Sequence, residues 1–339
     1  MNPTQLHEIQ SLRAIASISV LFGHAQNEAR HIAQVGYNFE KISFPWNWGV
    51  DLFFVISGFI MVYTSTRLFG QQGAAKKFLT RRFIRIVPLY WFFTSLAVVV
   101  LLVLPSAADT TKLAWSHTAY SYLFLPATAP SSQIAPTLDL GWTLNYEMYF
   151  YVLFAAFLFL PMRWAVTGLT IFLGGTIAIA ALVDIQLTAL LFWFKPIVLE
   201  FALGMLLGLA YLKNLRTNWT TNLIIGAIGV ALLAADLNQT RLIAYGIPAC
   251  MIFYAIVFSS NRISHPKWLS SLGDSSYTLY LSHPFALGSC ALIWKWLEPD
   301  ASLFIFAVLA SVVAIVSAHI FYLVAEAPAM RLLKSKLAA

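Results

Sequence analysis

The sequence predicts an all-α protein built as a polytopic bundle of about ten transmembrane helices. Hydrophobic residues make up 60% of its 339 positions, charged residues make up 10%, and the mean hydropathy is +0.75. A water-soluble fold cannot cover such a chain with polar surface, so lipid is its expected solvent. The apolar runs approach the roughly 20 residues that cross about 30 Å of hydrocarbon, and none has the short alternating pattern of a barrel strand.

The ten expected spans are apolar runs separated by polar, Gly and Pro residues. The first follows a polar N-terminus, Met1 to Gln10, which lacks the basic region and cleavage site of a signal peptide, so we expect it to be retained as a helix. The Gly174-Gly175 pair allows a bend in the fifth span, and the segment Asp236 to Arg241 divides the seventh from the eighth. In chain order, the spans cover residues 9–27, 47–66, 86–104, 142–160, 164–183, 190–210, 221–236, 242–259, 272–291 and 302–325.

The segments between the spans hold no second domain. Residues 105–141, rich in Pro, Ser, Thr and Ala, form the longest outer loop and are expected to cap a site or to connect two spans. The chain has no long soluble segment, low-complexity tract or clear repeat, so residues 1–339 are expected to form one membrane domain. Cys250 and Cys290 lie inside apolar runs, where each is expected to act as a small buried hydrophobe.

The basic residues are divided unevenly between the two sides of the expected bundle. Ten spans place both termini on one side, and fourteen Lys and Arg residues fall on that side against five on the other. By the positive-inside rule both termini are cytoplasmic, so the excess of 21 Lys+Arg over 14 Asp+Glu reports orientation and gives no support for a nucleic-acid partner. The fourteen are Arg67, Lys76, Lys77, Arg81, Arg82, Arg85, Arg163, Lys213, Arg216, Arg262, Lys267, Arg331, Lys334 and Lys336, and the five are Arg30, Lys41, Lys112, Arg241 and Lys295.

Ionisable side chains inside the spans are functional candidates, because an unpaired charge near the bilayer centre costs several kcal/mol. Arg13 and His24 are eleven residues apart in the first span, so they project from one face of a helix with roughly 16 Å between them along its axis. Arg13 is then expected near the cytoplasmic end of the span and His24 in its outer half.

Three other spans carry ionisable groups at the expected depth of His24, namely Asp51, Glu147 and His283. A carboxylate beside an imidazole fixes its tautomer and raises its basicity, so His24 with Asp51 or Glu147 is the candidate general base for a hydroxyl proton. The structural alternatives are a hydrogen-bonded core histidine and, for the two acids, an ion pair that locks helices together or a charge that favours a helix dipole. The pair of His24 and His283 is weak support for a metal, since the chain has no metal-type Cys/His spacing.

A basic segment precedes the third span on the cytoplasmic side. If this segment is helical, Arg82 and Arg85 occupy adjacent positions on its surface and can grip phosphates bidentately. The alternative, which composition alone favours, is an interfacial helix held by anionic lipid. The basic residues of the segment are Lys76, Lys77, Arg81, Arg82 and Arg85.

Other polar residues inside the spans are expected to join helices. Ser57-Gly58 in the second span is expected to let two helices approach closely. The remaining candidates for helix pairing are Lys195, Glu200, His319 and Glu326.

Six motifs follow one another along the chain, from Ile9 to Arg331. They are Ser11-Leu-Arg13 followed by His24; Gly49-Val-Asp51-Leu-Phe-Phe-Val-Ile-Ser57-Gly58-Phe59; Arg81-Arg82-Phe-Ile-Arg85-Ile-Val-Pro88-Leu-Tyr90; Trp142-Thr-Leu with Glu147 and Tyr149; Ser275-Ser-Tyr277-Thr-Leu-Tyr-Leu-Ser-His283-Pro284; and Glu326-Ala-Pro328. Each motif alone is modest support, and the six together are specific. In this order they resemble acyltransferase family 3, the membrane O-acyltransferases of O-antigen and exopolysaccharide type, and the resemblance covers nearly the whole chain.

The resemblance implies an enzyme of the bacterial inner membrane that moves an acyl group, with acetyl the commonest, from cytoplasmic acyl-CoA to a hydroxyl of a polysaccharide or lipid-linked sugar. Acyl-CoA is then a donor substrate, and no permanently bound cofactor or metal is expected. The expected catalytic residues are His24, Asp51, Glu147 and Arg13. The expected donor-binding residues are Arg81, Arg82, Arg85 and Arg13, and the expected acceptor-binding residues are Trp142, Asn145, Tyr149 and His283.

Larger members of the family carry an added extracytoplasmic hydrolase-like domain, for which this chain has no residues left. That difference leaves room for a polysaccharide-assembly partner, and a homo-oligomer stays open. The alternative function is a proton-coupled membrane transporter in which the outer His, Asp and Glu groups form a proton relay, although the chain lacks an evident inverted repeat.

Overall fold

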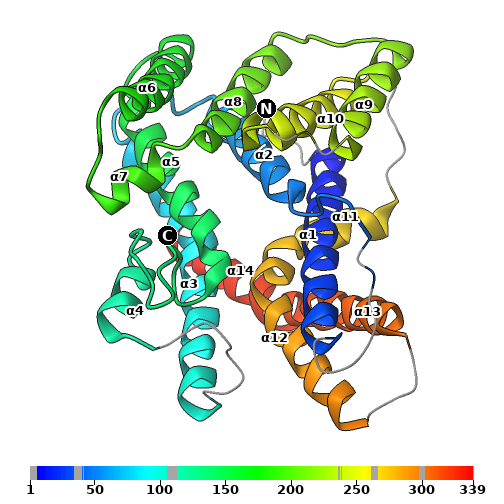
Figure 1. Cartoon of the computed structure of the whole chain (residues 1–339). Coiled ribbons are helices and arrows are strands. Elements are labelled where there is room, and N and C mark those ends of the chain that lie inside the picture. Colours follow the sequence, from blue (N-terminus) through cyan, green and yellow to red (C-terminus); the bar gives the residue numbers. More distant parts are fainter. Residues whose placement is uncertain are drawn as a thin grey trace.

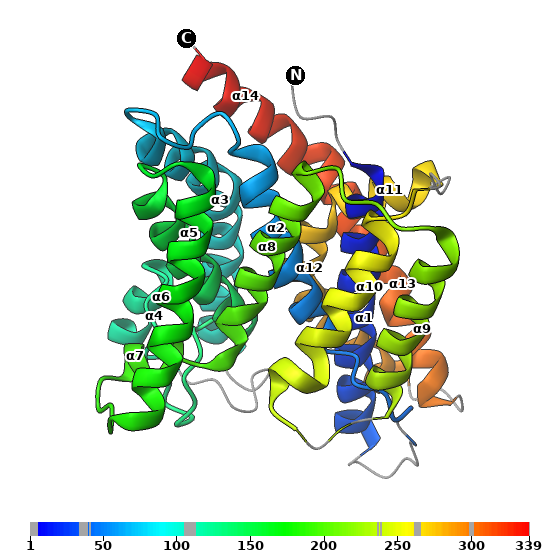
Figure 2. The same ribbon diagram turned by 90° about the horizontal axis from the view of Figure 1, so that it is seen from above.

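The all-α class is confirmed in the part of the chain that the structure describes. The computed structural model describes residues 6–33, 40, 42–104, 113–235, 237, 239–260, 266–297 and 302–338. Within these residues the only β contacts are two isolated bridges, between Thr128 and Ile134 and between Thr217 and Ser259. Most helices run along a common direction, with the start of the first helix and the last helix at the same end of the bundle (Figure 2).

Fourteen α-helices and several short 3₁₀ or π segments follow one another along the described chain (Figure 1). They are α1 (His7–Ala33), α2 (Trp48–Thr64), α3 (Ala74–Val103), α4 (Trp115–Tyr122), η2 (Asp139–Gly141), α5 (Trp142–Phe157), α6 (Met162–Leu182), α7 (Thr188–Trp193), η3 (Pro196–Val198), α8 (Leu199–Leu212), α9 (Trp219–Ala234), η4 (Leu242–Gly246), α10 (Ile247–Val257), α11 (Lys267–Asp274), α12 (Ser276–Leu297), α13 (Leu303–Phe321), η5 (Tyr322–Glu326) and α14 (Ala327–Ala338).

Several predicted spans differ from the helices in their limits, the third and the sixth most strongly. The third begins at Ala74 instead of residue 86, because the basic segment is itself helical and continues without a break through Pro88. The sixth, residues 190–210, is wrong as one continuous helix. α7 ends at Trp193, and Lys195 has extended backbone with φ −85° and ψ 150°. Pro196 disfavours the helical conformation for the residue before it, so the helix restarts after Lys195 as η3 and α8.

The described helices have the length, composition and apolar surface of a membrane protein. Three of them are long and apolar enough to cross a bilayer: Ala74–Val103, Met162–Leu182 and Leu303–Leu333. Four more are apolar but shorter: Trp48–Thr64, Pro196–Leu212, Trp219–Ala234 and Leu242–Val257. The number of ten spans and the cytoplasmic placement of the ends stay predictions. Lys41, Lys112, Asp236, Arg262 and residues 105–112 of the long loop lie outside the described residues.

The helices α2 and α8 pack closely against each other (Figure 1). A Cβ atom added to Gly58 would lie 2.1 Å from the Phe201 carbonyl oxygen, and one added to Gly204 would lie 2.1 Å from the Val55 carbonyl oxygen. Both helices therefore approach with only hydrogen atoms at the crossing, as expected for small residues between membrane helices. The prediction that Ser57-Gly58 allows close helix approach is confirmed.

Packing of α1 against α12 and α13 fixes the position of the C-terminal half of α1. Leu21 and Ala25 of α1 share one buried cluster with Leu279 and Leu287 of α12, and all four side chains are at most 4% exposed. His24 lies between the two α1 residues of this cluster in the sequence. The same packing therefore holds His24 against α12.

Candidate active site

A cavity of about 290 Å³ lies between α1, α2, α3, α5 and α12. On α2 its lining extends from Val50 to Thr64, which corresponds to roughly 21 Å of helix length. The cavity is therefore elongated along the bundle. It joins the end where the basic part of α3 lies to the end where α5 begins.

Three arginines from two helices face this cavity: Arg13 of α1, and Arg82 and Arg85 of α3. Arg13 donates a hydrogen bond of 3.1 Å to Gln10 Oε1, and Arg82 donates one of 3.2 Å to Thr64 Oγ1. The guanidinium of Arg82 also lies over the rings of Phe78 and Tyr151, at 5.4 and 5.8 Å from their centroids. The helical arrangement required of Arg82 and Arg85 is thus present, and Arg13 faces the same space.

Arg81 is placed differently from its two neighbours. Its side chain is exposed, and the cavity lining of the described residues does not include it. Its predicted role in donor binding stays a prediction, and the interfacial alternative fits its exposure better.

Glu147 is the only acid among the described residues that line the cavity. Ser57 Oγ donates a hydrogen bond of 2.9 Å to its carboxylate, and the Tyr151 hydroxyl donates another. The carboxylate also interacts electrostatically with Arg13 and Arg82. Three cations facing one anion leave the cavity positively charged, which suits a ligand that carries several phosphate charges.

His24 and His283 lie side by side, with ring centroids 5.0 Å apart and ring planes at 69°. His283 is 1% exposed, and its Nδ1 lies 3.0 Å from the Leu279 carbonyl oxygen. Its ring is 6.2 Å from the ring of Tyr280, which lines the cavity. Neither histidine is among the described residues that line the cavity: His283 contacts the lining residue Tyr280, and His24 contacts His283.

Asp51 has a different partner from the one proposed for it. Arg241 Nε donates to Asp51 Oδ1 at 2.9 Å, and a second guanidinium nitrogen donates to Oδ2 at 2.7 Å. Glu200, fully buried like Asp51, interacts electrostatically with both groups. The structural alternative for Asp51, an ion pair that locks helices together, describes this contact, and a catalytic role for Asp51 stays a prediction.

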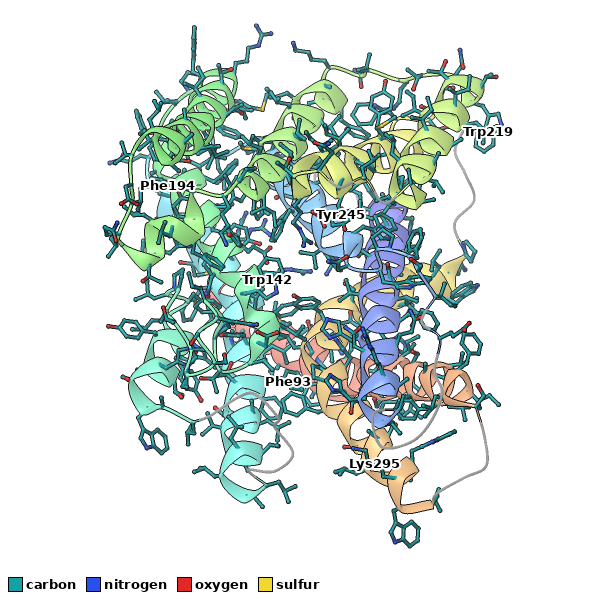
Figure 3. The ribbon with its side chains drawn as sticks, viewed as in Figure 1. Phe93, Trp142, Phe194, Trp219, Tyr245 and Lys295 are labelled. Atoms are coloured by element: carbon teal, nitrogen blue, oxygen red, sulfur yellow. The ribbon has the colours of Figure 1, made fainter. Side chains whose placement is uncertain are left out.

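Sequence reasoning missed Arg241, because it was counted only as a charge in an outer loop. Its guanidinium lies 5.6 Å from the ring centroids of both Trp142 and Tyr245, which Figure 3 shows near the middle of the molecule. No spacing in the sequence links Arg241 to Asp51, which precedes it by 190 residues.

The other predicted acceptor-binding residues lie in packed surroundings. Trp142 contacts Arg241, and Tyr149 stacks on Trp193 with ring centroids 5.0 Å apart. Asn145 is only 1% exposed. Their roles in acceptor binding stay predictions.

Polar contacts also tie the start of α12 to the following helices. Thr278 donates a hydrogen bond to Glu326 of η5, and His319 Nδ1 lies 3.1 Å from Ser275 Oγ. Both contacts fit the helix-pairing role expected of Glu326 and His319. Lys195 does not lie within a helix as expected, since it is exposed at the break before Pro196.

Comparison with known proteins identifies the family. A family model described as "Acyltransferase domain" matches residues 6–323. The exopolysaccharide production protein ExoZ of Rhizobium meliloti (strain 1021) is 36% identical over 259 residues, which cover 72% of this chain and 77% of ExoZ. Acyltransferase MdmB of Streptomyces mycarofaciens is 25% identical over 373 residues, which cover 97% of this chain and 92% of MdmB. No solved structure matches. Because the family model spans nearly the whole sequence, the chain belongs to the acyltransferase 3 family of membrane acyltransferases.

Proposed function

We propose that this acyltransferase moves an acetyl group from cytoplasmic acetyl-CoA to a hydroxyl of a polysaccharide or lipid-linked sugar in the bacterial inner membrane. The observation that supports this proposal most is the elongated cavity. It has Arg13, Arg82 and Arg85 in its lining, and its lining residue Tyr280 contacts His283, which lies against His24. A carbohydrate acceptor is proposed because one relative is named for exopolysaccharide production.

The arginines supply the chemistry that a coenzyme A donor requires. Coenzyme A carries its negative charges on phosphates at one end and its thioester at the other, joined by a narrow pantetheine arm. Guanidinium groups bind phosphate oxygens bidentately, so Arg82 and Arg85 would hold the phosphate end. The cavity along α2, roughly 21 Å long, would then direct the arm through the bundle toward the histidines.

The proposed reaction uses His24 as the general base. A ring nitrogen of His24 takes the proton of the acceptor hydroxyl while the hydroxyl oxygen attacks the thioester carbonyl carbon. The carbon–sulfur bond then breaks, and the departing thiolate of coenzyme A receives the proton from the imidazolium. An acyl-histidine intermediate is the variant in which His24 itself attacks the thioester first.

Substitution of His24 tests this function directly. His24→Ala is expected to abolish transfer of radiolabelled acetyl from acetyl-CoA to carbohydrate in membrane vesicles while folded protein is retained. The matched control is His31→Ala, because His31 is an exposed histidine on the same helix. Full turnover by the His24 variant would refute the proposal. Solute uptake by vesicles without acetyl transfer would favour the transporter alternative.

A further inference from the structure

The structure assigns His283 as the residue that orients His24, in the place where the sequence suggested a carboxylate. This assignment rests on the proposed role of His24 as a base. It names His283 as the group that fixes the tautomer of His24. An imidazole serves as a base only when its proton is on the other nitrogen, so a base needs a hydrogen-bond acceptor behind it. The two carboxylates considered for this task have other partners, since Asp51 binds Arg241 and Glu147 accepts from Ser57 and Tyr151.

The tautomer of His283 follows from its contact with the backbone. A carbonyl oxygen cannot donate a hydrogen bond, so the 3.0 Å contact between His283 Nδ1 and the Leu279 oxygen requires the proton to be on Nδ1. The ring is 1% exposed, so Nδ1 has this backbone carbonyl instead of water as its partner. In the neutral ring, Nε2 therefore carries a lone pair and can only accept.

The Nε2 acceptor of His283 is unoccupied within the described structure, and the ring that carries it lies beside His24. His283 Nε2 is buried and has no hydrogen-bond partner among the described residues. A buried acceptor without a donor is costly, and such a group is often kept for a functional reason. The nearest aromatic ring that carries an N–H is His24, at 5.0 Å between centroids and close to edge-on. In the state that transfers the acyl group, one N–H of His24 donates to His283 Nε2, and the other nitrogen of His24 faces the acceptor hydroxyl.

Two substitutions of His283 separate this positioning role from a structural one. Asparagine keeps an N–H near the position of Nδ1 and thus the bond to the Leu279 oxygen, but it removes Nε2. Glutamine places an amide oxygen near the position of Nε2 and gives up the bond to Leu279. If His283 positions His24, His283→Asn lowers kcat by roughly 10- to 100-fold with an unchanged KM for acetyl-CoA, while His283→Gln retains more of the activity. If His283 had only a structural role, His283→Asn would retain more activity than His283→Gln.

The tautomer of His24 provides a readout that does not depend on turnover. The chain has seven histidines, so nitrogen NMR of ¹⁵N-histidine-labelled protein is resolvable, and His24→Ala assigns the His24 signals by difference. With coenzyme A bound, the expected result is a single neutral tautomer of His24 in the unsubstituted protein and in His283→Gln, and a mixture in His283→Asn. An unchanged His24 tautomer and unchanged kcat in His283→Asn would overturn the assignment while leaving the role of His24 intact. Turnover in His24→Ala would instead overturn the function itself.

Discussion

Arg241 and Asp51, 190 residues apart in the sequence, form a bidentate ion pair at the start of α2. The Asp51 side chain is fully buried, whereas that of Arg241 is 28% exposed. Arg241 also donates to the Asn47 carbonyl oxygen and contacts the Trp142 ring. The pair therefore joins the segment before η4 to α2 and to the first residue of α5.

Removal of Arg241 should destabilise the fold more than removal of an ordinary surface arginine. Arg241→Ala leaves the buried Asp51 carboxylate without its cation, which costs about 3–5 kcal/mol for a buried pair. The measurement is thermal unfolding in detergent, with the exposed Arg163→Ala as the control. An unchanged melting temperature would contradict the structural role. Full stability of Asp51→Asn with a strongly reduced kcat would instead support Asp51 as a catalytic residue.

The crossing of α2 and α8 should tolerate no added methyl group. Gly58→Ala places a Cβ 2.1 Å from the Phe201 carbonyl oxygen, so the helices must separate, at a cost of roughly 1–3 kcal/mol. Gly174→Ala is the matched control, since a Cβ there meets nothing within 4 Å. Alanine is favoured over glycine inside a helix, so this control should be neutral or slightly stabilising. Equal melting temperatures for both variants would show that the crossing is looser than described.

The fold class followed from the sequence because it depends on composition and on the length of apolar runs. These runs located the helical cores well, as for α2 and α5. They gave the wrong start for α3, because this helix begins in the basic segment and continues into the apolar run. The charged ends of the basic side chains can reach water or lipid head groups. The break before Pro196 was readable from the proline itself, but the hydropathy of residues 190–210 concealed it.

The site could be predicted in part, because helical spacing places residues within one helix but not between helices. Spacing alone put Arg82 and Arg85 on one surface, and both face the cavity. Helical spacing cannot assign partners that lie on different helices, so Arg241 was missed as the partner of Asp51. Tyr280, which lies between the cavity and His283, had no signal that distinguishes it from a core aromatic.

Neutralising Glu147 should strengthen binding of the anionic donor. Glu147→Gln removes the only negative charge among the described cavity residues while keeping an oxygen that can accept from Ser57. Since Arg13, Arg82 and Arg85 stay, the affinity for coenzyme A should rise by about two- to fivefold. Isothermal titration with coenzyme A measures this change. Tyr151→Phe, which keeps the charge, is the control with little expected effect. Weaker binding in Glu147→Gln would mean that the carboxylate holds the arginines in position.

Charge removal on α3 should weaken donor binding only where the side chains face the cavity. Arg82→Gln with Arg85→Gln removes two phosphate-binding groups, so the KM for acetyl-CoA should rise by roughly 10-fold or more. Lys76→Gln with Lys77→Gln removes the same charge from the exposed first turn of the same helix and should leave KM unchanged. A similar loss in both double variants would show that α3 acts through anionic lipid instead of through the donor, because a lipid contact depends on the total charge of the segment.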